Sequence, residues 1–242
     1  MKTLSDTDTV NKAFDGADTV FWLVPPNPAA EDLNGYYLGF TRPAAEAVRQ
    51  QGVRRVVGVS SLGHDYGRNA GNLSAAFAMD DLIEDTGVAY RSLRMSFFME
   101  NLLMQAQGIK QGVFSLPNSA DRLLRLVATP DIAAAAADVL SDASWSGQAS
   151  IPVLSPDALT PNDMAHTMSE VLGRPVAFQQ TPLGDFKATM LQYGLSDSWA
   201  QGLVDMATAQ NDGIYEPEAA TATPSPTTFA QWCEQVLKPA TA

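Results

Sequence analysis

Two serines at the end of an apolar run are the side chains of this sequence best placed to do chemistry. Ser60 and Ser61 lie in Gly58-Val59-Ser60-Ser61-Leu62-Gly63, and His64 follows directly. A strand leading into Gly-x-Ser-x-Gly is typical of the nucleophile elbow of hydrolases, in which small residues flank a strained turn. Here Leu62 stands where the second glycine belongs, and a histidine four residues after Ser60 does not fit the usual triad order. Hydrolysis is therefore not expected, and the simplest role for the hydroxyls is to cap the following turn.

Metal, thiol and nucleic-acid functions have little support in the composition of the 242 residues. Cys233 is the single cysteine and the two histidines, His64 and His166, lie far apart, so no zinc site is expected. The 15 basic residues against 27 acidic residues give a net charge of −12, which argues against nucleic acid and anionic membrane surfaces. No apolar run reaches the roughly 18 to 20 residues of a membrane-spanning helix, and the first six residues lack the apolar core of a signal peptide. A cytoplasmic protein is the expectation.

The order of the elements in the first half indicates a parallel sheet. The continuous apolar run over 19–24 is typical of a strand buried on both faces, a second run lies at 56–60, and a third strand is expected over 89–94. Helical patterns lie between them at 34–51 and 73–85. This alternation favours βαβ units with right-handed crossovers. The predicted fold class is therefore α/β, a Rossmann-like doubly wound parallel sheet with helices on both faces.

The second half is mainly helical. Capping residues, prolines at first helical positions and terminating glycines predict several helices. The helices are expected over 129–140, 160–172, 183–193, 197–209 and 228–237, with one short strand at 151–154. We therefore predict a Rossmann-like domain over 1–156 and a small helical substrate lobe over 157–242.

Several stretches, taken in order, carry a resemblance to a known family. They are Ala13-Phe14-Asp15-Gly16-Ala17-Asp18-Thr19-Val20-Phe21 with Val24-Pro25-Pro26, Val57-Gly58-Val59-Ser60-Ser61-Leu62-Gly63, Arg94-Met95-Ser96-Phe97-Phe98-Met99-Glu100-Asn101, Thr129-Pro130-Asp131-Ile132-Ala133, and Leu159-Thr160-Pro161 through Val171-Leu172-Gly173-Arg174-Pro175-Val176. Their order and spacing resemble the NmrA-like family of atypical short-chain dehydrogenase/reductases, which bind NAD(P). The resemblance spans nearly the whole chain.

The resemblance implies a dinucleotide site, but its phosphate-binding part has no counterpart here. Family members begin with a strand, a GxxGxxG turn and two further strands, because glycines let backbone amides approach the pyrophosphate at a helix N-terminus. Here a helix capped by Ser5 or Asp6 leads straight into the strand at 19–24, and the glycines at 63, 67 and 71 have a different spacing. We therefore expect a sheet that is N-terminally truncated relative to the family, and weak or lost binding of NADP or NAD.

The proton-donating pair of the superfamily is also missing. Classical members use Tyr-x-x-x-Lys, in which the lysine lowers the pKa of the tyrosine. Tyr66 follows the two serines, but Ala70 stands four residues after it. The usual acid–base mechanism is therefore not expected.

The resemblance nonetheless implies a set of site residues. It places Ser60, Ser61, Tyr66 and Asn101 as the catalytic side chains that hold a substrate carbonyl. Each has a plain structural alternative, such as a turn cap for the serines or a surface position for the tyrosine. The residues implied to contact the cofactor are Val24, Pro25, Pro26, Ser60, Arg94, Phe97 and Phe98, although two adjacent phenylalanines are equally typical of core packing.

Two functions follow from these observations. One is an NAD(P)H-dependent oxidoreductase acting on a small carbonyl or quinone-type acceptor, in which the cofactor carries the chemistry. The other is a non-catalytic, nucleotide-sensing or regulatory protein, or an inactive truncated paralogue. The absent Tyr/Lys pair favours the second, and the stretches around Ser60, Phe98 and Asn101 favour the first.

The strand at 19–24 is expected to lie at an exposed edge. In the order 3-2-1-4-5-6 it would be flanked by the first strand of the sheet, which has no counterpart in this sequence. The segment carries no charge and no proline before Pro25, whereas natural edge strands are usually short, charged or covered. We predict that it pairs with a second copy of the chain, is covered by the helix at 6–15, or aggregates.

Overall fold

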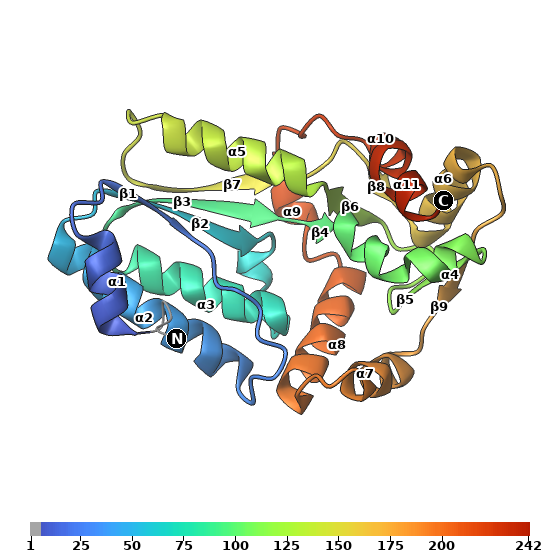
Figure 1. Ribbon diagram of the computed structural model, residues 1–242, viewed down its shortest axis with the longest axis horizontal. Helices are drawn as coiled ribbons and strands as arrows, with labels where there is room; N and C mark the ends of the chain where they lie inside the picture. The colour runs from blue at the N-terminus through green and yellow to red at the C-terminus, as the bar shows by residue number, and fades with distance from the viewer. Residues whose placement is uncertain (1–5) are drawn as a thin grey trace.

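The structure is a computed structural model in which residues 6–242 are described (Figure 1). The first half contains α1 (Thr7–Phe14), β1 (Thr19–Trp22), α2 (Leu33–Gln51), β2 (Arg55–Ser61), the 3₁₀ turn η1 (His64–Tyr66), α3 (Asn72–Glu84), β3 (Ala89–Met95), β4 (Phe97–Phe98), the 3₁₀ segment η2 (Met99–Gln105), α4 (Ala106–Lys110), β5 (Val113–Leu116), β6 (Leu124–Val127), α5 (Thr129–Ser141) and β7 (Gln148–Val153). The second half contains β8 (Ala158–Leu159), α6 (Pro161–Leu172), β9 (Ala177–Gln180), α7 (Leu183–Gln192), α8 (Asp197–Asn211), α9 (Glu216–Ala219), α10 (Phe229–Trp232), the π-helical turn η3 (Cys233–Leu237) and α11 (Lys238–Ala240).

A parallel sheet with the order β1-β2-β3-β7 forms the centre of the first half. One core cluster packs its β1 and β2 side chains, such as Val20 and Val56, against α1, α2 and α3. A second cluster packs Val57 and Leu93 against α5, on the other face (Figure 1). This confirms the predicted α/β fold with a doubly wound parallel sheet.

Local signals start and end the helices close to the predicted positions. The Asp6 side chain accepts the Thr9 amide at 2.9 Å and caps α1, and the Asp32 side chain caps α2 in the same way. A reciprocal capping box between Thr160 and Asp163 starts α6. Gly52, which ends α2, has φ +70°, a conformation that favours glycine. Ser5, the other predicted cap of α1, lies outside the described residues.

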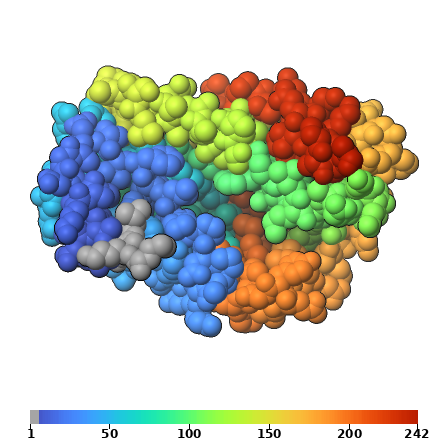
Figure 2. Space-filling model, in the orientation of Figure 1, coloured from blue at the N-terminus to red at the C-terminus, as the bar shows by residue number. Residues whose placement is uncertain are grey.

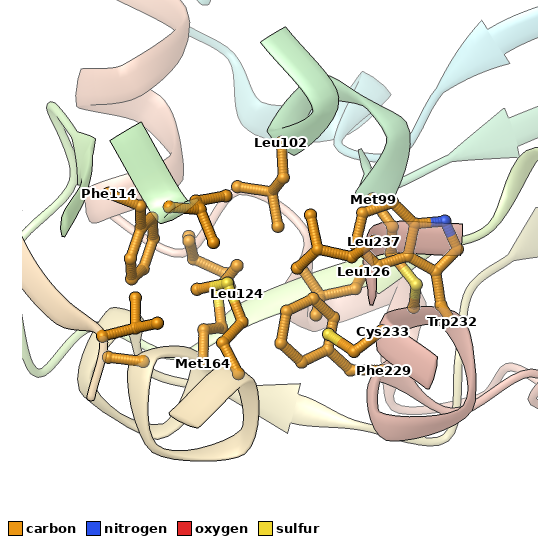
Figure 3. Close-up of a cluster of buried hydrophobic side chains, with 14 of the residues drawn as sticks. Met99, Leu102, Phe114, Leu124, Leu126, Met164, Phe229, Trp232, Cys233 and Leu237 are labelled. Carbon is orange, nitrogen blue, oxygen red and sulfur yellow. The ribbon is translucent and has the colours of Figure 1, made fainter. Parts of the chain in front are cut away.

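The second half shares a core with part of the first. Met99, Leu102, Phe114 and Leu124 lie in one cluster with C-terminal side chains that include Met164, Phe229, Trp232 and Leu237 (Figure 3). Three strand pairs accompany this cluster, with β4 and β8 on either side of β6, and β5 beside β9. The sequence analysis did not predict β4, β5, β6, β8 or β9. The domain boundary at residue 156 stays a prediction, and this cluster contains residues from both sides of it.

The strand at the edge of the sheet, β1, has one buried face and one exposed face. Trp22 is only 3% exposed, and its indole N–H donates to the Thr41 hydroxyl at 3.2 Å, whereas Phe21 is 43% exposed and Leu23 51%. Phe14 of α1 packs edge-on against the Trp22 ring, so α1 lies on the α2 face of the sheet. Only one neighbouring strand pairs with β1 among the described residues. The open apolar side of β1 is therefore carried by Phe21 and Leu23.

We expect Phe21→Lys to leave the free energy of unfolding within about 1 kcal/mol of wild type, because the ring is largely exposed already. The matched change Trp22→Lys should cost about 3–5 kcal/mol, because it removes a buried ring and buries a charge. Urea unfolding measures both, and sedimentation velocity reports whether Phe21→Lys reduces self-association. Equal losses of stability in the two variants would contradict this arrangement of β1.

Candidate functional site

The carboxyl ends of β1, β2 and β3 point to the same edge of the sheet (Figure 1). In open α/β sheets, ligands bind in the crevice outside these ends. Figure 2 shows that the surface is hollowed there, between the blue segment around β1 and α2, the green segment of η2 and α4, and the orange segment of α7 and α8. Teal and red-brown segments, which the colour bar assigns to the region after β2 and the region around α9, form the floor of this recess. The recess is the candidate functional site.

The two serines lie at the end of β2 but are enclosed. Ser60 is 7% exposed and Ser61 6%. The Ser61 hydroxyl donates to the backbone carbonyl of Leu62 at 3.1 Å, whereas the enclosed Ser60 hydroxyl makes no hydrogen bond of ordinary geometry and lies close enough to the Asp80 carboxylate to lower its pKa. The Ser96 hydroxyl, just beyond β3, is equally buried and has no hydrogen-bond partner. Buried polar atoms without partners are rare in native proteins, and each requires an explanation such as a bound water or ligand.

The segment 213–222, which we call the strap, covers the end of β2. Ile214, Tyr215 and Ala219 pack in one cluster with Leu62, and a Cβ added to Gly63 would lie 2.2 Å from Cγ1 of Ile214. The Tyr215 hydroxyl accepts from Nε2 of Gln210 at 3.1 Å. Burial raises the pKa of Tyr215, and the Gln210 and Ser61 side chains oppose that shift. The strap therefore encloses the serines, and the sequence analysis assigned it no role.

Arg94 belongs to a buried network of charges between the sheet, α3 and the strap. Its Nη1 donates to Oε2 of Glu218 at 3.1 Å, and its Nε lies 3.9 Å from Oδ2 of the fully buried Asp80. Tyr90 and Ser92 donate to the two Asp80 oxygens at 2.6 and 2.8 Å. Burial raises the pKa of Asp80, while the hydroxyls of Tyr90, Ser60 and Ser92 and the charge of Arg94 act against the shift. The predicted role of Arg94 in cofactor binding is untested, and in the structure its guanidinium faces two carboxylates.

Tyr66 contacts the end of α8. Its hydroxyl donates to Oδ2 of Asp212 at 2.8 Å, and the Arg68 guanidinium lies over its ring at 4.3 Å from the centroid. Burial is the largest cause of the raised pKa of Tyr66, followed by the hydrogen bond to Asp212. The structure thus groups Tyr66 with Asp212 and Arg68, and its proposed contact with a substrate stays a prediction.

The remaining predicted residues divide between core and surface. Val24 is buried beside β1, while Pro25 and Pro26 are exposed and the Pro25 carbonyl accepts the Tyr36 hydroxyl at 2.8 Å. Phe97 and Phe98 are half-buried against two different core clusters. Asn101, on η2, is exposed. The two exposed prolines thus follow β1, and Asn101 follows β4. Both segments leave the edge of the sheet at which the recess lies.

The residues around the recess fit the nicotinamide ring of a dinucleotide better than its pyrophosphate. The half-buried side chains of Phe97 and Phe98 and the unpartnered hydroxyl of Ser96 suit a ring that carries an amide. For the pyrophosphate, residues 6–242 contain no GxxGxxG turn. The N-terminus of α3, which follows the glycines at 63, 67 and 71, is covered by α8, because a Cβ on Gly71 would lie 1.9 Å from the Gly202 carbonyl oxygen. That helix end therefore offers no space for a phosphate.

Metal and membrane sites find no support within residues 6–242. No three His, Cys, Asp or Glu side chains of this range are grouped to hold a metal ion. In the same range, no helix combines the length and apolar character that crossing a membrane requires. A hollow of about 10 Å³ under β1, lined by side chains that include Phe14, Trp22 and Ile83, is apolar and is no larger than a single water.

Comparison with known proteins identifies the family. The NmrA-like family matches residues 2–233. An NAD(P)H azoreductase of Xenophilus azovorans is 28% identical over 210 residues, which are 84% of this chain and 68% of that protein. The chain spans between 59% and 70% of the length of the four curated relatives it matches.

Two solved structures show the shared fold. An NADPH-dependent quinone oxidoreductase from Escherichia coli, complexed with NADPH, has a TM-score of 0.78 at 23% identity and covers 96% of this chain and 80% of its own. A negative transcriptional regulator complexed with NAD has a TM-score of 0.72 at 14% identity and covers 98% of this chain and 79% of its own. The resemblance found in the sequence is thus confirmed, and the chain belongs to the NmrA-like family.

Proposed function

We propose that the recess holds the nicotinamide end of NAD(P)H and a small carbonyl or quinone-type acceptor, so that the protein is an NAD(P)H-dependent oxidoreductase. The observation that carries this proposal is the recess at the carboxyl ends of β1, β2 and β3, together with the buried Ser96 hydroxyl just beyond β3, which has no hydrogen-bond partner. A buried polar group without a partner costs about 1–3 kcal/mol, and a ligand at this edge would remove that cost. The relatives support the class of acceptor, because they include an azoreductase and a quinone oxidoreductase.

The bound cofactor would supply the hydride, and the side chains of the chain would hold and orient the acceptor. Pro25, Pro26 and Phe98 present apolar surface for a flat ring, and the Asn101 amide can donate to the oxygen of an acceptor. Ser60 and Ser61 lie deeper, under the strap, and reach an acceptor only if the strap or the turn after β2 shifts.

The binding of the cofactor by this chain is expected to be weak. A GxxGxxG turn, which residues 6–242 do not contain, supplies charge-assisted backbone hydrogen bonds to a pyrophosphate, each worth roughly 1.5–3 kcal/mol. The loss of two or three such bonds moves a micromolar dissociation constant to about millimolar or weaker. Assays of function therefore need millimolar NADPH.

The test of this function is quinone-dependent oxidation of NADPH, with Asn101→Ala as the diagnostic variant. If Asn101 holds the acceptor, kcat/KM for the quinone falls by about tenfold, the loss of one hydrogen bond of about 1.4 kcal/mol. Gln107→Ala, an exposed amide on α4 that follows η2, is the control and should keep wild-type kinetics. Unchanged kinetics in Asn101→Ala would remove this residue from the site.

A nucleotide-sensing role is the second candidate. The absence of a Tyr-x-x-x-Lys pair at Tyr66 and the enclosure of both serines favour it. A sensor would bind NADPH or NADH, as shown by titration, without oxidising it in the presence of any quinone or carbonyl acceptor. An oxidoreductase would consume the cofactor in the same mixture.

A further inference from the structure

The carboxylate of Glu218, on α9, accepts hydrogen bonds from the turn that follows β2 and from a side chain of β3. Its Oε1 accepts the backbone N–H of Gly63 at 2.7 Å and that of His64 at 3.3 Å. Its Oε2 accepts Nη1 of Arg94 at 3.1 Å. The Glu218 side chain is 17% exposed, so these interactions are only weakly screened by solvent.

The first pair of donors fixes the turn that ends β2. Gly63 has φ +96°, and two successive amides point at one carboxylate oxygen, an arrangement that binds anions strongly. Hydrogen bonds to a carboxylate are about twice as strong as neutral ones. Because this turn follows Ser60 and Ser61 directly, its conformation determines where the end of β2 and both hydroxyls lie.

The third donor connects the same carboxylate to β3. Arg94 lies in register with Ser60 on the neighbouring strand, so the two residues are adjacent across the ladder. Asp80 and Glu218 flank the Arg94 guanidinium, which is 11% exposed. Loss of the charge on Glu218 would leave Asp80, at 3.9 Å, as the carboxylate that pairs with Arg94 and would weaken the hydrogen bond between residue 218 and the guanidinium.

From this geometry we infer that Glu218 is the positioning residue of the site. This inference rests on the proposed function, because the site that Glu218 would position is the proposed acceptor site. Glu218 holds the turn after β2 and the Arg94 side chain in one arrangement, and it does so from the C-terminal strap. The strap therefore does more than cover the end of β2. Through the charge of Glu218 it also sets the geometry at the ends of β2 and β3.

The diagnostic variant is Glu218→Gln, which keeps the size of the side chain and removes its charge. Its matched control is Glu216→Gln on the same helix, where Glu216 pairs with Arg125 at 2.8 Å and does not contact the turn. In native-state amide hydrogen exchange, the Gly63 amide should exchange about tenfold faster or more in Glu218→Gln, and at the wild-type rate in Glu216→Gln. Unchanged exchange at Gly63 in a folded Glu218→Gln would overturn the inference.

Steady-state kinetics separate positioning from general stability. In Glu218→Gln, the apparent kcat for a quinone at a fixed millimolar NADPH concentration should fall by about tenfold while the dissociation constant for NADPH, from a fluorescence titration, stays within about twofold, and Glu216→Gln should match wild type. If Glu218→Gln does not fold, Glu218→Asp keeps the charge on a shorter side chain and should give faster exchange at Gly63 than wild type. A wild-type protein that reduces no acceptor would contradict the proposed function alone, because the exchange measurement still decides whether Glu218 holds the turn.

Discussion

Gly63→Ala is expected to lower the free energy of unfolding by about 2–5 kcal/mol. The φ of +96° costs a residue with a Cβ about 1–2 kcal/mol, and overpacking adds about 1–3 kcal/mol. The added Cβ would lie 2.2 Å from Cγ1 of Ile214 and 3.0 Å from its backbone oxygen. The strap must therefore move away from the end of β2, and the loss of its contacts exposes part of the cluster that contains Leu62 and Tyr215.

Gly67→Ala is the matched control, because Gly67 lies at the other end of η1 and also has a positive φ, of +71°. Its added Cβ would meet nothing closer than 4.0 Å, so only the conformational cost of about 1 kcal/mol remains. Urea unfolding at a fixed pH gives both losses. Equal losses in the two variants would show that the strap does not press on the turn at Gly63.

Asp80→Ala is expected to cost about 3–5 kcal/mol, the range for breaking a buried ionic network by removing one partner. The change leaves the Tyr90 and Ser92 hydroxyls without an acceptor and removes the carboxylate that lies 3.9 Å from Arg94. Asp81→Ala is the control, because Asp81 is the next residue of α3, its side chain is 60% exposed, and its partner is His64. That surface pair is worth less than about 1 kcal/mol. Losses of equal size would contradict the buried network.

The same carboxyl group gives the stability a pH dependence with a defined sign. Burial raises the pKa of Asp80 in the folded chain above its ordinary value. Between the two values the folded chain keeps a proton that the unfolded chain has lost, so stability falls as the pH rises through that window. Glu84, whose pKa is also raised by burial, adds a contribution of the same sign. Asp80→Asn cannot titrate, and its stability should therefore vary less with pH across this window than that of wild type.

The sheet could be predicted from the sequence because its signals are local. The first strand of the βαβ series is a continuous apolar run and the second is mostly apolar, and each helix between the strands has a cap or a terminating glycine, such as Gly52. The position of Ser60 and Ser61 at the end of β2 follows from the same pattern. The placement of these two serines at the carboxyl end of a central strand could thus be predicted without any tertiary information.

The strap and the short strands could not be predicted in this way, because their partners are far apart in the sequence. Glu218 meets Gly63 across 155 positions and Arg94 across 124, and no periodicity in 213–222 indicates such contacts. β5 and β9 have four residues each and are stabilised by pairing with each other. Tyr66 illustrates the same limit, since Asp212, to which it donates, lies 146 residues away.

A single NADPH titration shows whether the recess reduces a quinone while it binds the cofactor phosphates only weakly. Initial rates of NADPH oxidation are recorded with a quinone acceptor, while the NADPH concentration is raised from about 10 μM to several millimolar, the range that separates an intact phosphate site from a lost one. We expect a protein-dependent rate of NADPH oxidation that is lower in Asn101→Ala and that rises without saturation up to about 1 mM NADPH. The absence of any protein-dependent oxidation at millimolar NADPH would contradict the reductase site, and saturation in the low micromolar range would contradict the weak hold on the phosphates.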